Sequence, residues 1–433
     1  EFRHLYQDEK AIRVRARTVY TTMCSGGAMR GYGIPQAIFA LESHMDDIAR
    51  KLNIDPIELR KKNMMKKGFV DPGTNITCYS SGLAECMEKG KSYIGWDEKR
   101  LLYSRQKGPI RRGVGMAAFS YKTGVYPISL ETASCRMILN QDGSMQLQMG
   151  ATEIGQGADT VFTQMAAESV GFLIENIHLI STQDTDVTPF DTGAYASRQT
   201  YVSGMALRKT AEIFKRKILD YASGMLSIPV KKLDIRKSNI IEKATGVSLL
   251  SMEDLALEAC YSLTNSVHIT AESTNQCKTN TFAFGVCFAE IEVDIPLGKI
   301  KVLRLINVHD SGVLINPKLA EAQVHGGMSM GLGYALSEQL LYDEKGRPLN
   351  NNFLDYKIET SMDTPELCAD FVQTYDPSAP YGNKALGEPP AIPVAPAIRN
   401  ALLHATGVAV NTLPLSPQKL VERFLQAGLI KSH

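Results

Sequence analysis

One carboxylate, Glu388, has a setting that suits acid–base chemistry. It stands between a glycine and two prolines in the run Lys-Ala-Leu-Gly-Glu-Pro-Pro at residues 384–390, directly ahead of an apolar helical stretch. A proline fixes its own φ and restricts the residue before it, so Pro389 predicts an extended backbone at Glu388. The apolar neighbours would desolvate the carboxylate and favour its use as a general base. The same residues also fit an exposed acid at a helix start, where the helix dipole favours negative charge.

Glycine-bearing stretches are the second feature that could serve a ligand. Four of them also carry a polar side chain, at residues 26–33, 150–157, 193–199 and 323–327. Glycine permits positive φ and lets the backbone approach a ligand closely. Such loops can present peptide N–H groups to phosphate, as a dinucleotide or pterin cofactor requires. Any one of them is compatible with an ordinary turn, but four in one chain favour a ligand site.

Three further side chains have types that suit a cofactor or a flat substrate. Gln156 lies between two glycines, where its amide can donate to an oxo group or accept from a hydroxyl, or simply cap a helix. Tyr32 and Phe119 lie beside small residues and could stack on a heteroaromatic ring or pack in the core. Residues 113–118 match the G-x-G-x-x-A fingerprint, but no amphipathic helix follows them. This context argues against a Rossmann nucleotide site.

Composition sets the broad class of the protein. The chain has 433 residues, 44% of them hydrophobic, which predicts two or three domains. A net charge of +1 argues against a nucleic-acid binder that relies on general electrostatics. The eight cysteines form no Cys-x-x-Cys pair, so the chain's own motifs supply no iron–sulfur or zinc site. No apolar run reaches membrane-spanning length and the opening residues lack a signal-peptide pattern, which predicts the cytoplasm.

The elements that would position these residues are helices mixed with hairpins. Residues 11–20 are strand-like, a helix begins at Pro35, and a second follows Pro56 with the basic run at 60–67 as its solvated end. Residues 68–82 predict a loop, and residues 99–112 a boundary or crossover. Residues 142–143 and 296–299 each predict an antiparallel hairpin, and residues 155–157 open a helix. The mixture predicts an α+β fold.

Five separated motifs, taken together, resemble the molybdenum hydroxylases, the xanthine dehydrogenase/aldehyde oxidase family. They are Ala-Met-Arg-Gly-Tyr-Gly-Ile-Pro-Gln at 28–36, Thr-Glu-Ile-Gly-Gln-Gly at 152–157, Ala-Tyr-Ala-Ser-Arg-Gln at 194–199, Glu-Ala-Gln-Val-His-Gly-Gly at 321–327 and Gly-Glu-Pro-Pro at 387–390. Within the family, the chain is most similar to the C-terminal half of the molybdenum-binding subunit of bacterial xanthine dehydrogenases. The resemblance implies two molybdopterin-binding domains, with the first, incomplete at its N-terminus, at residues 1–110 and the second at 111–433.

The resemblance also implies roles for individual residues. Glu388 would be the general base, Gln156 would contact the apical oxygen of molybdenum, and Tyr32 and Phe119 would sandwich a purine ring. The metal would be held through the pterin dithiolene, with no direct side-chain ligand. The residues implied to bind the cofactor are Met29, Arg30, Gly31, Gly155, Gln156, Ala196, Ser197, Gln199, Gln323 and Gly387.

The implied activity is hydroxylation of xanthine or hypoxanthine to urate with oxygen from water. The cofactor would be molybdenum-molybdopterin, as the cytosine dinucleotide by the family's habit in bacteria. Electrons would pass to a 2Fe-2S centre and FAD on partner subunits and then to NAD. The family's Gly-Gly-Gly-Phe-Gly loop and its purine-reading glutamate and arginine are absent, so a partner chain would carry that half. Two alternatives stay open: a hydroxylase of another N-heterocycle, such as nicotinate, or of an aldehyde, and a catalytically silent assembly subunit.

Overall fold

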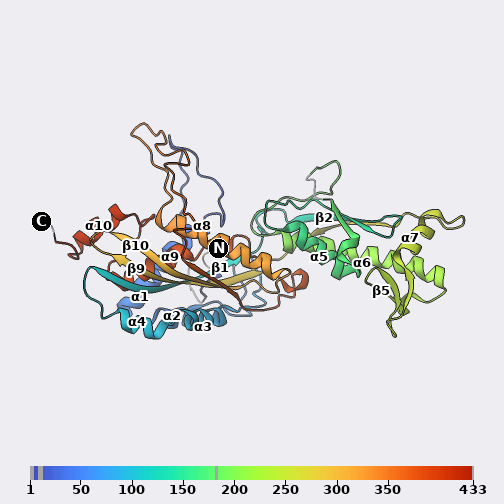
Figure 1. The fold of residues 1–433 in the computed structure, drawn as a ribbon, viewed down its shortest axis with the longest axis horizontal. Coiled ribbons are helices and arrows are strands. Elements are labelled where there is room, and N and C mark those ends of the chain that lie inside the picture. The colour runs from blue at the N-terminus through green and yellow to red at the C-terminus, as the bar shows by residue number, and fades with distance from the viewer. Residues whose placement is uncertain (1–3, 8–12, 181–183, 432–433) are drawn as a thin grey trace.

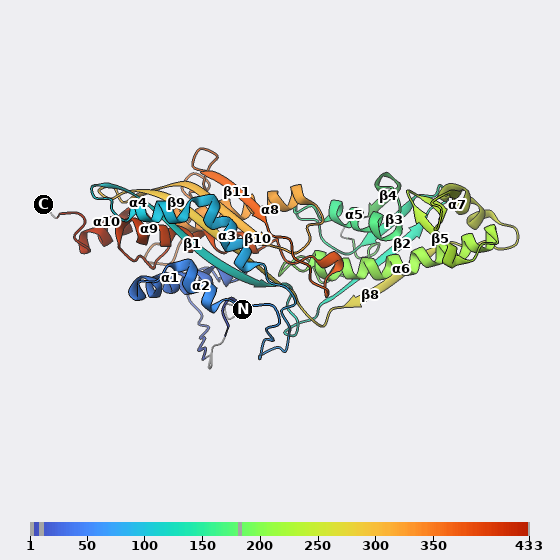
Figure 2. The same cartoon turned by 90° about the horizontal axis from the view of Figure 1, so that it is seen from below.

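The protein is elongated and consists of two lobes side by side along its longest axis (Figures 1 and 2). The computed structural model describes residues 4–7, 13–180 and 184–431. The first lobe holds a sheet of four strands with helices on both faces, and the second holds another four-stranded sheet and a small three-stranded one. The chain leaves the first lobe after β1 and returns to it at β9, so the elements of the second lobe from β2 to β8 are inserted between two parts of the first lobe.

The sheet of the first lobe has the order β1-β9-β10-β11. Its strands are β1 (Ile110–Lys122), β9 (Phe282–Asp294), β10 (Lys299–Asp310) and β11 (Glu366–Phe371). The β1–β9 and β9–β10 pairs are antiparallel and the β10–β11 pair is parallel. Because both faces of the sheet are covered, β1 and β9 are buried along most of their length rather than alternating between buried and exposed residues.

Helices pack on the sheet of the first lobe. Its helices are α1 (Ile34–Leu52), α2 (Pro56–Asn63), α3 (Leu83–Ile94), α4 (Trp96–Tyr103), α8 (Pro317–Leu336), α9 (Val394–Thr406) and α10 (Pro417–Gln426), with the 3₁₀ turn η5 (Pro389–Ala391). The 3₁₀ turn η4 (Pro380–Gly382) packs against the second lobe instead. A Cβ added at Gly115 would lie 2.1 Å from the backbone nitrogen of Ala401 in α9. The Gly-x-Gly run at 113–115 therefore lets α9 lie directly on β1, and it is part of a strand rather than a nucleotide-binding loop.

The second lobe is built around the long helix α6, which lies across a sheet of order β4-β3-β2-β8. Its elements are β2 (Thr132–Leu139), β3 (Met145–Met149), α5 (Ala158–Val170), η2 (Ile174–Asn176), β4 (Ile177–Ile180), α6 (Gln199–Leu226), η3 (Val230–Lys232), β5 (Leu233–Arg236), β6 (Asn239–Glu242), β7 (Ser248–Ser251), α7 (Met252–Tyr261) and β8 (Thr270–Gln276). Strands β5, β6 and β7 form the small antiparallel sheet.

Most predicted elements are confirmed. The hairpins at 142–143 and 296–299 are the β2–β3 and β9–β10 pairs. The helices after Pro35, Pro56 and residue 157 are α1, α2 and α5, and the loop at 68–82 lies between α2 and α3. The α+β fold class is confirmed, since antiparallel pairs outnumber parallel ones in the described residues.

The strand predicted at residues 11–20 is wrong for its described part. Residues 13–20 belong to no strand and are exposed, and residues 11–12 lie outside the described residues. The segment stands away from the first lobe (Figure 1). A strand needs a neighbour to pair with, and the described residues bring none to this segment. The alternation of apolar and charged residues was therefore not sufficient to predict a strand here.

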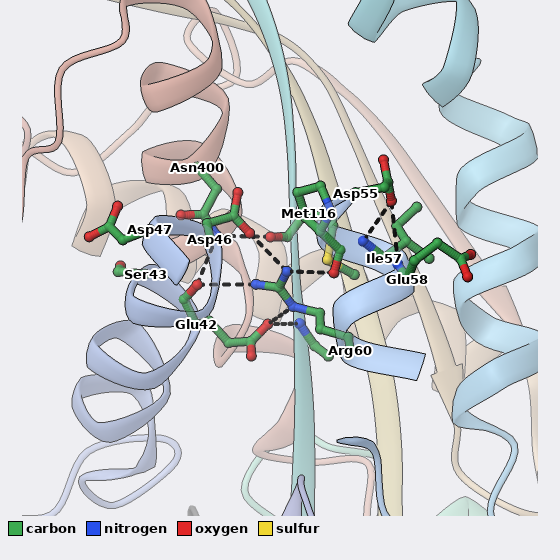
Figure 3. A network of polar contacts seen from close by, with 12 residues as sticks. Glu42, Ser43, Asp46, Asp47, Asp55, Ile57, Glu58, Arg60, Met116 and Asn400 are labelled. Atoms are coloured by element: carbon green, nitrogen blue, oxygen red, sulfur yellow. Dashed lines mark hydrogen bonds and ion pairs between the residues drawn. The ribbon is translucent and has the colours of Figure 1, made fainter. Parts of the chain in front are cut away.

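The basic end of α2 was predicted to be solvated, and Arg60 contradicts this. Its guanidinium is fully buried, with Nε 2.7 Å from an oxygen of Glu42 and Nη1 2.8 Å from an oxygen of Asp46 (Figure 3). Glu42 also accepts a hydrogen bond of 2.6 Å from the backbone N–H of Ala118 in β1. The side-chain amide of Asn400 in α9 donates to the backbone oxygen of Glu42. Arg60 thus links α2 to α1, and Glu42 links this ion pair to the sheet and to α9.

No helix within residues 4–7, 13–180 and 184–431 is long and apolar enough to cross a membrane.

Candidate cofactor and substrate site

A cavity of about 960 Å³ collects the predicted site residues from both lobes. Its volume lies at the upper end of the range for small-molecule sites. Every predicted site residue except Phe119 lines it. The lining includes Met29, Arg30, Gly31, Tyr32, Gly155, Gln156, Ala196, Ser197, Gln199, Gln323, Gly387 and Glu388. Motifs far apart in the sequence therefore meet on one concave surface.

Four helices begin at this cavity. The first residues of α1, α5 and α6 line it, and Asn316, which caps α8, lines it as well. The N-terminus of a helix carries partial positive charge and backbone N–H groups that lack intrahelical partners. Four such ends around one cavity favour an anionic ligand such as a phosphate.

Glu388 is held at the cavity wall by groups from three segments. The backbone N–H of Gly31 donates to Oε1 at 3.2 Å, and the Ser197 hydroxyl donates to Oε2 at 3.3 Å. The Tyr121 hydroxyl also donates to Oε2. The Ser197 Oγ in turn accepts a 2.9 Å hydrogen bond from the Glu388 backbone N–H. The carboxylate is therefore fixed by directional hydrogen bonds.

Two expectations about Glu388 need correction. Its backbone is helical, with φ −95° and ψ −35°, and not extended, because it begins the 3₁₀ turn η5 that leads into α9. Its side chain is half-buried among polar donors rather than surrounded by apolar residues. The apolar neighbours in sequence, such as Ile392 and Val394, instead join the hydrophobic cores of the first lobe.

Arg30 joins three of the predicted segments. Its Nε donates to the backbone oxygen of Gly387 at 2.6 Å, and its Nη2 donates to the backbone oxygen of Gln323 at 2.9 Å. Burial lowers the pKa of Arg30, and the charge of Glu388 acts in the opposite direction. Because arginine is not deprotonated in proteins, the guanidinium keeps its positive charge. The cavity wall therefore carries a fixed cation beside Glu388.

Gln156 is more occupied than predicted. Its Nε2 donates to the backbone oxygen of Thr152 at 2.8 Å and to Oε1 of Gln199 at 2.7 Å, while its own oxygen accepts from the Ile154 N–H. A primary amide has two donors, so both are used within the protein. For Gln156 to donate to a cofactor oxygen, its hydrogen bond to Gln199 would have to break.

The glycine loop around Gln156 also differs from the expectation that it offers free N–H groups. The carboxylate of Glu153 accepts from the N–H groups of Gly155, Gly157 and Asp159 at 2.7 to 3.1 Å. Burial raises the pKa of Glu153, but these backbone donors outweigh it and hold the pKa below its ordinary value. An internal carboxylate thus already occupies the anion-binding position of this loop.

The 193–199 loop is fixed by a residue that sequence reasoning did not single out. Arg198 is fully buried, 2.6 Å from an oxygen of Glu131 and 2.7 Å from an oxygen of Asp191. The loop that it anchors includes Ala196 and Ser197, whose φ values of 47° and 50° are unusual for residues other than glycine. An arginine among small residues could have drawn attention to this position. The sequence does not show that its partners are Glu131 and Asp191.

The two predicted aromatic residues have different environments. Tyr32 is 73% exposed and lines the cavity, so its ring is available for stacking. Phe119 is fully buried on β1, with its ring 5.1 Å from that of His309, and it does not line the cavity. The prediction that Phe119 faces the substrate does not fit this position. Tyr121, two residues further along the same face of β1, reaches the cavity instead.

The sequence of the chain is similar to those of molybdopterin-binding proteins. Models of the molybdopterin cofactor-binding domain match residues 89–365 and 3–64, which confirms the predicted pair of domains with the first in part. The chain is 50% identical over 422 residues to the xanthine dehydrogenase molybdenum-binding subunit of Escherichia coli O157:H7, covering 97% of this chain and 56% of that subunit. It is 29% identical to the aldehyde oxidoreductase molybdenum-binding subunit PaoC of Escherichia coli K12, over 92% of this chain and 52% of PaoC.

Solved structures agree with the sequence relatives. The reconstituted CO dehydrogenase from Oligotropha carboxidovorans superposes with a TM-score of 0.86 at 26% identity, covering 95% of this chain and 54% of that one. The chain thus spans a little over half the length of the relatives that it matches. With its motifs gathered at one cavity and this likeness in sequence and fold, the chain belongs to the molybdenum hydroxylase family of molybdopterin-binding oxidoreductases.

Proposed function

We propose that the chain contributes the cofactor cavity and the general base of a molybdenum-dependent purine hydroxylase, converting xanthine or hypoxanthine to urate. The observation that carries the proposal is the placement of Glu388 on the wall of a large cavity beside Arg30, with backbone and hydroxyl donors fixing its carboxylate. The 50% identity to a xanthine dehydrogenase subunit supports the purine substrate.

The cavity fits the molybdopterin cofactor in size and in charge. Its volume of about 960 Å³ accommodates a nucleotide-sized ligand, and the N-termini of α1, α6 and α8 together with Arg30 favour the ligand's phosphates. When bound, the cofactor supplies two-electron oxidation and delivers oxygen that comes from water. Residues that would hold it are Met29, Arg30, Gly31, Gly155, Gln156, Ala196, Ser197, Gln199, Gln323 and Gly387.

The side chains of this chain then perform the remaining tasks. Glu388 takes up a proton released from water as the substrate carbon is hydroxylated, and its hydrogen bonds keep the carboxylate in place for this step. Tyr32 offers an exposed ring on which a planar purine stacks. Gln156 would contact the cofactor once its hydrogen bond to Gln199 opens.

The working enzyme would contain further polypeptides. The chain spans 56% of the xanthine dehydrogenase subunit that it matches, so the remaining portion would close the substrate site. Subunits with a 2Fe-2S centre and FAD would carry the electrons to NAD, and the cofactor would be the cytosine dinucleotide form in a cytoplasmic enzyme. The division of this chain into units 1–110 and 111–433 belongs to the same proposal.

An aldehyde or another N-heterocycle is the second candidate substrate class. The 29% identity to an aldehyde oxidoreductase subunit favours it, because the same cavity wall would serve either class. Steady-state assays of the complete complex with xanthine, hypoxanthine, nicotinate and an aldehyde separate the two. Turnover of a non-purine alone would overturn the purine assignment. Absence of molybdenum and pterin from a complex produced under loading conditions would indicate a silent subunit instead.

A further inference from the structure

The two oxygens of the Glu388 carboxylate are unequally used. Oε2 accepts from both the Tyr121 hydroxyl and the Ser197 hydroxyl, whereas Oε1 accepts only from the Gly31 N–H among the described residues. Each carboxylate oxygen has two lone-pair positions for hydrogen bonds. The two hydroxyls therefore saturate Oε2, and one position on Oε1 stays open.

We infer that Oε1 of Glu388 is the atom that accepts the proton, and that Tyr121 is the positioning residue that makes it so. The inference rests on the proposed role of Glu388 as the base. Beyond that role, the inference identifies the carboxylate oxygen that accepts the proton and the residue that orients it. By binding Oε2, the Tyr121 hydroxyl keeps the carboxylate from rotating and leaves Oε1 beside the 28–34 segment at the cavity wall.

Tyr121 is suited to this role by its rigid position. It lies on β1, paired with Ala283 of β9 inside the sheet, and its side chain is 3% exposed. The residue packs in the same apolar cluster as Phe119 and Ile392 and also lines the cavity. Ser197 adds a second fixed contact, because the same Oγ also accepts from the Glu388 backbone N–H. A sheet residue positions a group more rigidly than a loop residue does.

The test is Tyr121→Phe in the complete, molybdenum-loaded complex, assayed with xanthine. The substitution keeps the ring and removes only the hydroxyl. We expect kcat to fall roughly ten-fold with KM within about two-fold, because a misplaced base weakens the transition state and not substrate binding. The control is Tyr103→Phe, which removes a buried tyrosine hydroxyl that donates 2.6 Å to Glu290, away from the cavity. This control should keep the wild-type kcat.

A crystal structure of the Tyr121→Phe complex supplies a readout that does not depend on turnover. The Glu388 carboxylate should be rotated or split between two orientations while the ring at 121 stays in place. An unmoved carboxylate together with wild-type kcat would overturn the inference. Glu388→Gln distinguishes the proposed base from the role of Tyr121. Full activity of Glu388→Gln refutes Glu388 as the base, whereas an inactive Glu388→Gln beside a fully active Tyr121→Phe refutes only the role of Tyr121.

Discussion

At the scale of single residues, the charged groups of the cavity are held by backbone atoms from distant parts of the chain. Arg30 donates to the carbonyls of Gly387 and Gln323, and Glu388 accepts from the N–H of Gly31. The residue types and spacing allowed Glu388, Gln156 and the glycine loops to be predicted. They could not reveal Tyr121, because a tyrosine in a strand carries no signal of what lies opposite its hydroxyl.

One buried residue near this site gives a pH-dependent prediction. His309 is fully buried, and neither ring nitrogen has a hydrogen-bond partner among the described residues. Burial, assisted by the charge of Arg30, lowers its pKa to about 3. The unfolded chain takes up this proton below about pH 6.5 and the folded chain does not, so stability falls as the pH drops from 6.5 towards 3, by about 1.4 kcal/mol per pH unit.

Replacing His309 with Phe should therefore flatten the acid side of the stability curve. The ring of His309 packs between those of Phe119 and Phe371, and phenylalanine suits that apolar position. Urea unfolding of both proteins at pH 7 and pH 5 measures the effect. We expect the wild type to lose about 2 kcal/mol more than His309→Phe over this interval. Equal losses in the two proteins would show that His309 titrates normally in the folded state.

At the scale of elements, close packing of helices on the first-lobe sheet depends on glycines. Gly115 lets α9 approach β1, so Gly115→Ala would drive a methyl group into the backbone of Ala401. We expect a loss of about 3 kcal/mol in the free energy of unfolding. Gly224→Ala is the matched control, because a Cβ at this exposed position in α6 meets nothing within 4 Å. Alanine there should raise stability by up to about 1 kcal/mol. Equal effects of the two substitutions would contradict this packing.

The buried Arg60 gives a second prediction about elements. Arg60→Met should cost about 3 to 5 kcal/mol of unfolding free energy, because Glu42 and Asp46 would be left buried without their cation. Arg216→Met removes a comparable contact with Asp220 on an exposed face of α6 and should leave the unfolding midpoint nearly unchanged. A mild effect of Arg60→Met would mean that water reaches this network. Helix periodicity predicted α1 and α2, but not that a basic residue at the end of α2 would turn inward.

At the scale of the whole molecule, the cavity lies between two lobes, the second of which is inserted between β1 and β9 of the first. Local patterns predicted the hairpins and helices and hence the α+β class. They could not predict that the glycine loops would meet, because that depends on how β1 and β9 lead from one lobe to the other. The family resemblance implied this meeting, because it assigned residues of the five motifs to one cofactor and substrate site.

The proposed function predicts that this chain does not work alone. Tyr32 is 73% exposed at the cavity, so a purine stacked on it would have one face uncovered. We expect the purified chain to show no turnover of xanthine, and the chain combined with the remaining portion of the subunit and the electron-carrying subunits to show it. Equal turnover by the isolated chain and the complex would refute the need for partners.

The most direct test of the central claim is Glu388→Gln in the complete complex. Glutamine keeps the shape of the side chain but cannot take up the proton, so turnover should fall by about 10² to 10⁴ while molybdenum and pterin contents stay at wild-type levels. Glu168→Gln, an exposed position on α5, controls for the loss of a carboxylate. Wild-type turnover by Glu388→Gln with the cofactor bound would contradict the assignment of Glu388 as the base.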